Sequence, residues 1–333
     1  YGLYALEQEV SNHNGAASRI EYPDKPTHTK IIPVLGTITN TAHLLDLLCE
    51  FSIDTVYHAA AYKHVPLVEM NILEGVRNNV LGTLSVAKAV AESHTKELVF
   101  ISSDKAVRPT NVMGASKRLA ELIVQGFSKR NGLEDKRYCI VRFGNVLKSS
   151  GSVIPLFEKQ IKKGGPVTVT DPDASRYFMT SEEASELVIQ AGAMSEGGEI
   201  FVLKMGEPVK IRDIAEKMIH LNGKVVGDSN FSGRDENDAI EIVYIGLRPG
   251  EKLSEELFIG ESLIDSSHPK IMIANDGCLS WDALQDLCLK LEAACLESDY
   301  PLMRGTLEYF VDGYTMLVEP VDPVILKSLE SAH

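Results

Sequence analysis

Apolar runs alternate with amphipathic helical patterns through the first half of the chain, and this alternation restricts the possible folds more than any other feature. The apolar runs lie at 30–36, 54–61, 97–103 and 137–146, and the helical patterns between them lie at about 41–52, 66–93 and 113–131. Near-continuous apolar strands separated by amphipathic helices are typical of a parallel sheet covered on both faces. We therefore expect a doubly wound α/β fold, with ligands bound beyond the carboxyl ends of the strands.

The second half of the 333-residue chain follows a different pattern. It runs through a turn-rich stretch at 164–178, a helix at 181–194, a strand at 199–206, a helix at 209–223, and a strand, tight turn and helix at 240–258. The last 60 or so residues carry helical patterns and few chemical signals. The chain also begins in a helical pattern with no strand before it, which favours a fragment of a longer protein.

Charge and cysteine content exclude several classes of protein. Lys and Arg number 33 against 47 Asp and Glu, and the net charge of -14 argues against a nucleic-acid partner or an anionic membrane surface. The five cysteines form no CxxC pair, which is typical of reduced thiols, and His58 and His64 match no metal-ligand spacing. No apolar run reaches the roughly 18 residues that span a bilayer. We expect a cytoplasmic protein without a metal, and no membrane segment in this chain.

An acid and a base stand side by side where the third apolar run ends. Asp104 and Lys105 follow this run directly, so we expect them at the carboxyl edge of the sheet, where chemistry is found in such folds. Met113 and Lys117 come next, four residues apart, and this spacing puts them on one face of a helix. A serine at a strand end, here Ser103, followed by such an i, i+4 pair is the layout of short-chain dehydrogenase/reductase enzymes.

Several motifs occur in a fixed order and together resemble one family. They are "YHAAAYKHV" (57–65), "NVLGT" (79–83), "SSDKAVRPTNVMGASK" (102–117), "VRFGNVLKSSGSVIP" (141–155), "SRYFMT" (175–180) and "LRPGEKLSEEL" (247–257). Over roughly residues 1–275 the chain resembles the nucleotide-sugar 4,6-dehydratases of the extended short-chain dehydrogenase superfamily. It is most similar to the branch in bacterial polysaccharide biosynthesis that acts on UDP-N-acetylglucosamine. In the large, membrane-anchored members of that branch a methionine replaces the usual tyrosine, as Met113 does here.

The resemblance implies a Rossmann-like fold in three regions. A dinucleotide-binding domain is expected at 1–150 and a smaller nucleotide-sugar-binding region at 151–275, of which 181–206 returns to the main sheet. A helical extension follows at 276–333. The Gly-rich fingerprint of the family is absent from the chain, and we expect it upstream of Tyr1. The resemblance also implies a UDP-sugar as substrate, a homo-oligomer, and a parent protein that can carry a membrane anchor.

The resemblance gives the charged pair its roles in water loss across C5 and C6 of the sugar. Asp104 is expected to be the acid at the C6 oxygen and Lys105 the base at C5. The pKa of a lysine must fall by about 3 units before it acts as a base at neutral pH. Because a paired carboxylate would oppose that fall, we expect the two side chains to point apart. The acceptor of the 4-OH proton stays open between Lys117 through a water, Lys105 and Asp104.

Cofactor and substrate residues follow from the same motifs. The cofactor is expected to be NAD, with NADP possible, and its candidate residues are Gly36, Thr37, His58, Ala59, Ala60, Ala61, Asn79, Ser102 and Lys117. Thr37 stands where the family commonly has an aspartate. The candidate substrate residues are Lys63, Asn145, Ser152, Val153, Arg176, Arg248 and Glu251. The two arginines suit a diphosphate, because guanidinium groups match phosphate oxygens.

Three alternatives to a retaining 4,6-dehydratase stay open. The subtype that inverts C5 typically keeps the tyrosine, so Met113 favours the retaining subtype. A UDP-sugar 4-epimerase needs neither an acid at C6 nor a base at C5, and the pair Asp104 and Lys105 would have no purpose there. A non-catalytic scaffold domain would explain the missing fingerprint.

Overall fold

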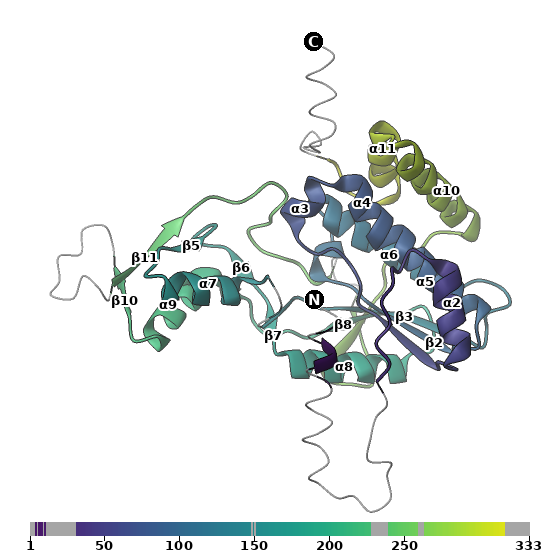
Figure 1. Ribbon diagram of the computed structural model, residues 1–333, viewed down its shortest axis with the longest axis horizontal. Helices are drawn as coiled ribbons and strands as arrows, with labels where there is room; N and C mark the ends of the chain where they lie inside the picture. The colour runs from purple at the N-terminus through teal and green to yellow at the C-terminus, as the bar shows by residue number, and fades with distance from the viewer. Residues whose placement is uncertain are drawn as a thin grey trace, which may run out of the picture.

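A computed structural model describes residues 4, 6–8, 10, 31–147, 149, 151–227, 239–258 and 263–316. It has a large lobe built around a mixed sheet and a smaller lobe beside it (Figure 1). The expected helical start of the chain and the last part of the expected C-terminal extension lie partly outside the described residues.

The sheet of the large lobe has six strands among the described residues, in the order β1-β2-β3-β8-β13-β12. Their bounds are Thr55–His58 (β1), Glu97–Ile101 (β2), Arg137–Arg142 (β3), Ile200–Leu203 (β8), Ile271–Ala274 (β13) and Leu263–Asp265 (β12). The first four strands are parallel to one another, and β13 runs antiparallel to both of its neighbours, β8 and β12. In β2, Leu98, Val99 and Phe100 are almost fully buried, as the apolar run predicts. The α/β fold class is confirmed.

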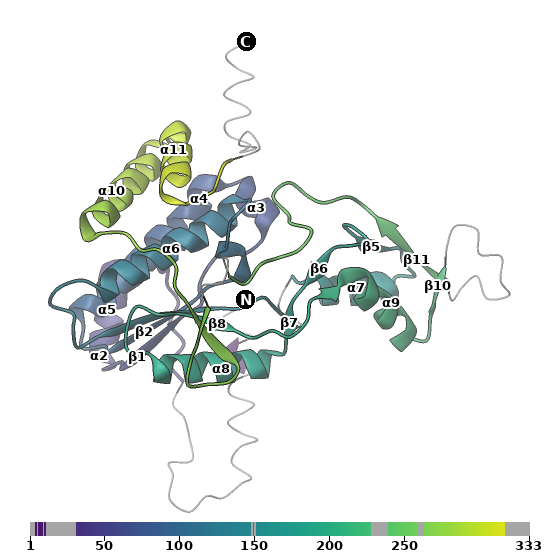
Figure 2. The same ribbon diagram turned by 180° about the vertical axis from the view of Figure 1, so that it is seen from behind.

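Helices cover both faces of this sheet (Figures 1 and 2). One face carries α2 (Thr41–Glu50), α5 (Gly82–Glu92) and α6 (Val112–Ser128), and the other carries α8 (Ser181–Met194). The helix expected at 66–93 is broken into α3 (Val65–Glu69), α4 (Ile72–Val76), the π-helical turn η1 (Arg77–Leu81) and α5. Outside α6 lie α10 (Trp281–Glu297) and α11 (Tyr300–Phe310).

The smaller lobe has a core of its own. Its parallel sheet runs β10-β11-β5, with bounds Val225–Gly227, Ala239–Tyr244 and Val167–Val169, and it packs on α7 (Val153–Lys162) and α9 (Ile211–Leu221). Phe157, Ile161 and Ile219 fill the space between these helices and the sheet. Two short strand pairs connect the lobes: β4 (Asn145–Val146) with β7 (Phe178–Met179), and β6 (Ser175–Arg176) with β9 (Val209–Lys210).

Two expectations of secondary structure are wrong. Residues 31–36 form no strand, because none of the described segments pairs with them through backbone hydrogen bonds. Residues 251–258 form no helix. They continue from the turn at Pro249 and Gly250 as an extended segment between the lobes, and we call residues 250–256 the strap. Its main-chain carbonyls accept hydrogen bonds from side chains of both lobes instead of from a helix.

A buried ion network ties four segments of the large lobe together. Arg142, at the end of β3, has no exposed side-chain surface and binds Glu121 of α6 through two nitrogens, at 2.7 and 2.6 Å. Its Nη2 also lies 2.7 Å from Asp276 Oδ2, beyond β13. Ser102 donates to Glu121 at 2.6 Å, and Arg118 donates to the same carboxylate at 3.0 Å. The carboxyl ends of β2 and β3 are therefore fixed against α6.

Candidate active site

The carboxyl end of β2 turns sharply into a single 3-10 turn, η2 (Asp104–Ala106). Ser103 begins this turn, since its hydroxyl accepts from the Lys105 amide at 3.3 Å and donates to Asp104 Oδ1 at 2.8 Å. The Asp104 amide donates to the carbonyl of Phe143, after β3, at 3.1 Å. Helix α6 then presses on the turn so closely that a Cβ on Gly114 would lie 2.3 Å from the Lys105 carbonyl oxygen. The acid and the base are thus held by their main chain.

The expectation that Asp104 and Lys105 point apart is wrong. Lys105 Nζ lies 3.0 Å from Asp104 Oδ1, and the Asp104 side chain has no exposed surface. Adjacent side chains diverge on a strand, but these two residues sit in a 3-10 turn, and the lysine is long enough to reach back. The pKa of Lys105 is raised and not lowered: burial would lower it, but the carboxylates of Asp104 and Glu255 outweigh burial.

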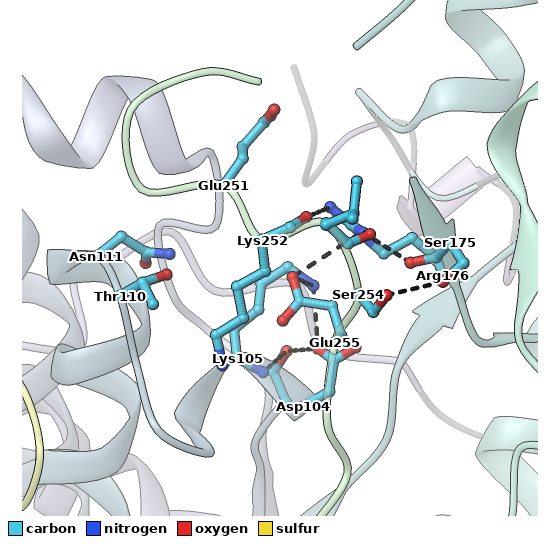
Figure 3. Close-up of polar contacts among 12 residues, drawn as sticks. Asp104, Lys105, Thr110, Asn111, Ser175, Arg176, Glu251, Lys252, Ser254 and Glu255 are labelled. Carbon is cyan, nitrogen blue, oxygen red and sulfur yellow. Dashed lines mark hydrogen bonds and ion pairs between the residues drawn. The ribbon is translucent and has the colours of Figure 1, made fainter. Parts of the chain in front are cut away.

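Glu255, on the strap, is a member of this cluster that the sequence did not single out (Figure 3). Its Oε1 lies 3.7 Å from Lys105 Nζ and 3.8 Å from Nε of Arg176, and its side chain is 5% exposed. Asp104 Oδ2 and Glu255 Oε2 are both buried and have no hydrogen-bond partner among the described residues. Two buried carboxylate oxygens beside one ammonium group are therefore left without a hydrogen bond among the described residues. No motif separates Glu255 from Glu256, so the sequence carries no signal for it.

Met113 and Lys117 lie on α6, behind the turn. Met113 is 2% exposed and belongs to the core of the large lobe. Lys117 Nζ donates to the carbonyl of Ile101 at 2.9 Å and lies 4.8 Å from the centre of the Phe100 ring. Burial lowers the pKa of Lys117 to about 8, although the carboxylate of Glu121 opposes this. At the carboxyl end of β2, the ammonium group of Lys117 therefore loses its proton more readily than an ordinary lysine.

The small residues after β1 form an open edge. Ala59 and Ala60 are exposed and line an apolar hollow of about 320 Å³ with Ile38 and Val86. His58 is buried and exchanges a hydrogen bond with Thr83 at 2.9 Å. Its pKa is lowered to about 3, chiefly by burial and secondly by Lys117, so the ring is neutral at pH 7.

Other cofactor candidates lie further from the charged cluster or have partners within the protein. Asn79 holds the main chain of Tyr62, accepting from its amide at 2.7 Å and donating to its carbonyl at 3.0 Å. This contact fixes the segment that follows the three alanines. Gly36 and Thr37 are exposed in the turn before α2.

The substrate candidates fall into two groups. Asn145 lies in β4, next to Gly144, where a Cβ would come within 3.2 Å of Asp104 Oδ2. Ser152 and Val153 begin α7, the hydroxyl of Ser152 is buried, and the preceding glycine packs against the ring of His64, next to Lys63. This group therefore gathers near the boundary between the lobes.

The second group lies in the strap, in the turn just before it, and in β6, the strand that the strap crosses. The Nη groups of Arg176 donate to the carbonyls of Ser175, Leu253 and Lys252, at 2.7 to 2.9 Å. Arg248 is exposed, and its amide donates to Glu251 Oε2 at 3.2 Å. Glu251 points away from Asp104 and Lys105 (Figure 3). The structure therefore brings Arg176, and not Arg248 or Glu251, to the charged pair.

Neither a membrane-spanning helix nor a metal-binding cluster occurs among the described residues. None of the helices within the described ranges is both long and apolar enough to cross a bilayer. In the same part of the chain, no three His, Cys, Asp or Glu side chains gather in a way that could hold a metal ion.

The chain matches the family described as "Polysaccharide biosynthesis protein" over residues 3–276. It is 49% identical over 255 residues to the capsular polysaccharide biosynthesis protein CapD of Staphylococcus aureus, covering 77% of this chain and 39% of CapD. It is 34% identical to a UDP-glucose 4-epimerase of Rickettsia typhi, covering 71% of this chain and 64% of that enzyme. The crystal structure of Pen from Bacillus thuringiensis is 36% identical, with a TM-score of 0.64, over 77% of this chain and 80% of Pen.

More distant solved structures, 18–22% identical, show the same fold, and several of them were determined with NAD bound. The chain spans about two fifths of the length of the first curated relatives that it matches. The family match covers most of the chain and includes the Asp104–Lys105 turn, α6 and the strap. This chain therefore belongs to the polysaccharide biosynthesis protein family, and it has the Rossmann-like fold of the extended short-chain dehydrogenases.

Proposed function

We propose that the chain is the catalytic part of a UDP-N-acetylglucosamine 4,6-dehydratase that uses NAD and supplies a surface polysaccharide. The observation that carries the proposal is the turn η2, which holds a buried acid and a base on adjacent residues at the carboxyl end of a central parallel strand. Elimination of water needs one acid and one base at neighbouring carbons. A 4-epimerase needs neither group at these positions.

The residues at the carboxyl ends of β1 and β2 fit a dinucleotide. The exposed Ala59 and Ala60 leave room that larger side chains would fill, and Lys117 offers a buried ammonium group for a ribose hydroxyl. His58, Ala61, Asn79, Ser102, Gly36 and Thr37 complete the proposed cofactor side. When bound, NAD would accept a hydride from C4 and return it to C6.

The protons balance within the charged pair. Asp104 takes the 4-OH proton on its open Oδ2 and delivers it to the C6 oxygen, which leaves as water. Lys105 takes the C5 proton and returns it to C5 after C6 has been reduced. Of the three candidates for the 4-OH proton, Asp104 is supported by the unpartnered Oδ2. Ser103 orients the other carboxylate oxygen, and Met113 occupies the tyrosine position without exchanging a proton.

The substrate is proposed to bind between the lobes. Asn145, Ser152, Val153 and Lys63 lie near the boundary, and Arg176 connects it to the charged pair. Arg248 and Glu251 remain substrate candidates. They would contact the substrate only if their side chains turned towards the charged pair. Binding must also loosen the contact between Lys105 and its carboxylates, because the paired ammonium group cannot act as a base.

The test is incubation with UDP-N-acetylglucosamine and NAD, using this chain and the full-length product of its gene. We expect a UDP-4-keto-6-deoxy sugar, with the configuration at C5 read by NMR. An inverted C5 would establish the inverting subtype. The 34% identity to a UDP-glucose 4-epimerase favours the epimerase as second candidate, and UDP-N-acetylgalactosamine as sole product would establish it. No product from either protein would indicate a scaffold.

A further inference from the structure

The strap is fixed to the loop that follows the charged pair. Thr110 Oγ1 and Asn111 Nδ2 both donate to the carbonyl of Gly250, at 2.9 and 2.8 Å. Lys252 Nζ donates to the carbonyl of Val107 at 3.0 Å. The loop and the strap are far apart in sequence, so these contacts set the position of the strap relative to η2 (Figure 3).

The opposite side of the strap is fixed to β6. Arg176 donates to the carbonyls of Leu253 and Lys252, at 2.9 and 2.8 Å. The Ser175 amide donates to the carbonyl of Leu253 at 3.0 Å, and the hydroxyls of Ser175 and Ser254 lie 3.3 Å apart. A segment without regular secondary structure thus has a defined place, and the next residue, Glu255, is buried at the charged pair.

We propose that Glu255 is a positioning residue for the C5 proton transfer: its carboxylate and that of Asp104 hold the Lys105 ammonium group between them and control when it releases its proton. The inference rests on the proposed function, because it assigns a role in the same reaction. The inference adds the carboxylate of Glu255, which lies on the strap, to Asp104 and Lys105 as a third ionisable group.

The distances support this assignment. Lys105 Nζ lies 3.0 Å from Asp104 Oδ1 and 3.7 Å from Glu255 Oε1, and its side chain is 22% exposed. Arg176 faces the same Glu255 oxygen at 3.8 Å, so that oxygen is shared between two cations. Oε2 of Glu255 is buried and has no partner among the described residues, so it is free to accept a further hydrogen bond.

The charges around Lys105 come from three elements. Asp104 of η2 and Glu255 of the strap raise the pKa of Lys105, whereas burial and Arg176 of β6 lower it, and the sum is a raised pKa. Helix α6, which also packs on η2, carries Lys117, but the ammonium group of Lys117 is bound to the Ile101 carbonyl and does not add to these three charges. Two unit charges 3.7 Å apart in a partly buried site are coupled by about one to three pH units. Neutralising Glu255 should therefore make Lys105 lose its proton at a lower pH.

The test is Glu255→Gln, with Glu256→Gln as the matched control. The control removes the same charge one residue away, where the carboxylate is 44% exposed and pairs with Arg108 at 3.2 Å. The readout is competitive acetylation with acetic anhydride between pH 8 and 12, with the Lys105 peptide quantified by mass spectrometry. We expect the midpoint of Lys105 labelling to fall by at least about one pH unit in Glu255→Gln and to stay unchanged in Glu256→Gln.

An unchanged midpoint in Glu255→Gln, or an equal shift in both variants, would overturn the inference. The acidic limb of kcat/KM, which reports the free enzyme, should move with the labelling midpoint. A shifted midpoint in a protein that forms no keto sugar would refute the proposed function and leave the control of Lys105 by Glu255 intact. If Glu255→Gln loses its cooperative unfolding transition, Glu255→Asp replaces it. That variant withdraws the carboxylate by one carbon–carbon bond, and the midpoint should fall by a smaller amount.

Discussion

The contact between α6 and η2 makes Gly114→Ala a test of the geometry of the charged pair. The new Cβ would lie 2.3 Å from the Lys105 carbonyl oxygen and 3.0 Å from Pro109 Cβ. Carbon and oxygen atoms normally stay about 3.3 Å apart, so the turn and the helix must separate by about 1 Å. Because the obstacle is main chain, no change of rotamer can relieve it.

The magnitudes follow from this displacement. Overpacking of this kind costs about 1–3 kcal/mol, and the better helix propensity of alanine returns up to about 1 kcal/mol. We expect the free energy of unfolding to fall by about 1–2 kcal/mol in urea denaturation. A misplacement of about 1 Å at reacting groups can cost about 100-fold in rate. We therefore expect kcat for water loss to fall about 100-fold in a protein that still folds.

Gly126→Ala on the same helix is the control. There the new Cβ would meet Leu284 Cδ2 at 2.4 Å, the end of a side chain that can change rotamer. We expect a comparable or smaller change in stability and a kcat within about twofold of the unmodified protein. A Gly114→Ala protein with unchanged kcat would refute the argument that the main chain of η2 sets the position of Lys105.

Three further outcomes are expected. Lys105→Ala should abolish water loss and the solvent-deuterium exchange at C5, both followed by NMR, and exchange at the original rate would disprove Lys105 as the C5 base. Met113→Tyr should not raise kcat, because the proton path runs through other groups, and a large gain would show that methionine impairs this protein. Arg142→Leu should lower the free energy of unfolding by about 3–5 kcal/mol, because Glu121 and Asp276 lose their shared cation. If urea denaturation showed the free energy of unfolding to fall by less than about 1 kcal/mol, the argument that this network stabilises the fold would be wrong.

Sequence patterns correctly predicted two kinds of element: strands that are buried on both faces, and helices that are capped by residues close to them in the sequence. The run at 97–103 contains β2 (Glu97–Ile101), which has a neighbouring strand on each side, and Leu98, Val99 and Phe100 are almost fully buried. Helix α6 begins at 112 because Asn111 caps it, accepting from the Gly114 amide at 2.8 Å. Residues 31–36 failed as a strand because pairing depends on a partner elsewhere in the chain. Residues 251–258 do not form the predicted helix, because carbonyl groups of the strap accept hydrogen bonds from the side chains of Arg176 and Asn111 instead of from a helix backbone.

For the candidate site, the sequence singled out residues by their type and order but did not predict how their side chains contact one another. Asp104 and Lys105 stood out as a charged pair after an apolar run, but their ion pair depends on a turn that the sequence did not reveal. Glu255 and Glu256 are chemically identical neighbours, and only the fold makes one 5% exposed beside Lys105 and the other 44% exposed beside Arg108. The role of such a residue cannot be read before its surroundings are known.

The buried network around Arg142 has a consequence for how this sequence can change over time. Each member neutralises or orients another, so any single loss leaves a charge stranded in the interior, while joint replacement by apolar residues of similar volume can be tolerated. Homologous chains should therefore keep Glu121, Arg142 and Asp276 as a set or lose them as a set. Intermediates that carry one change alone would be selected against through their lower abundance in the cell.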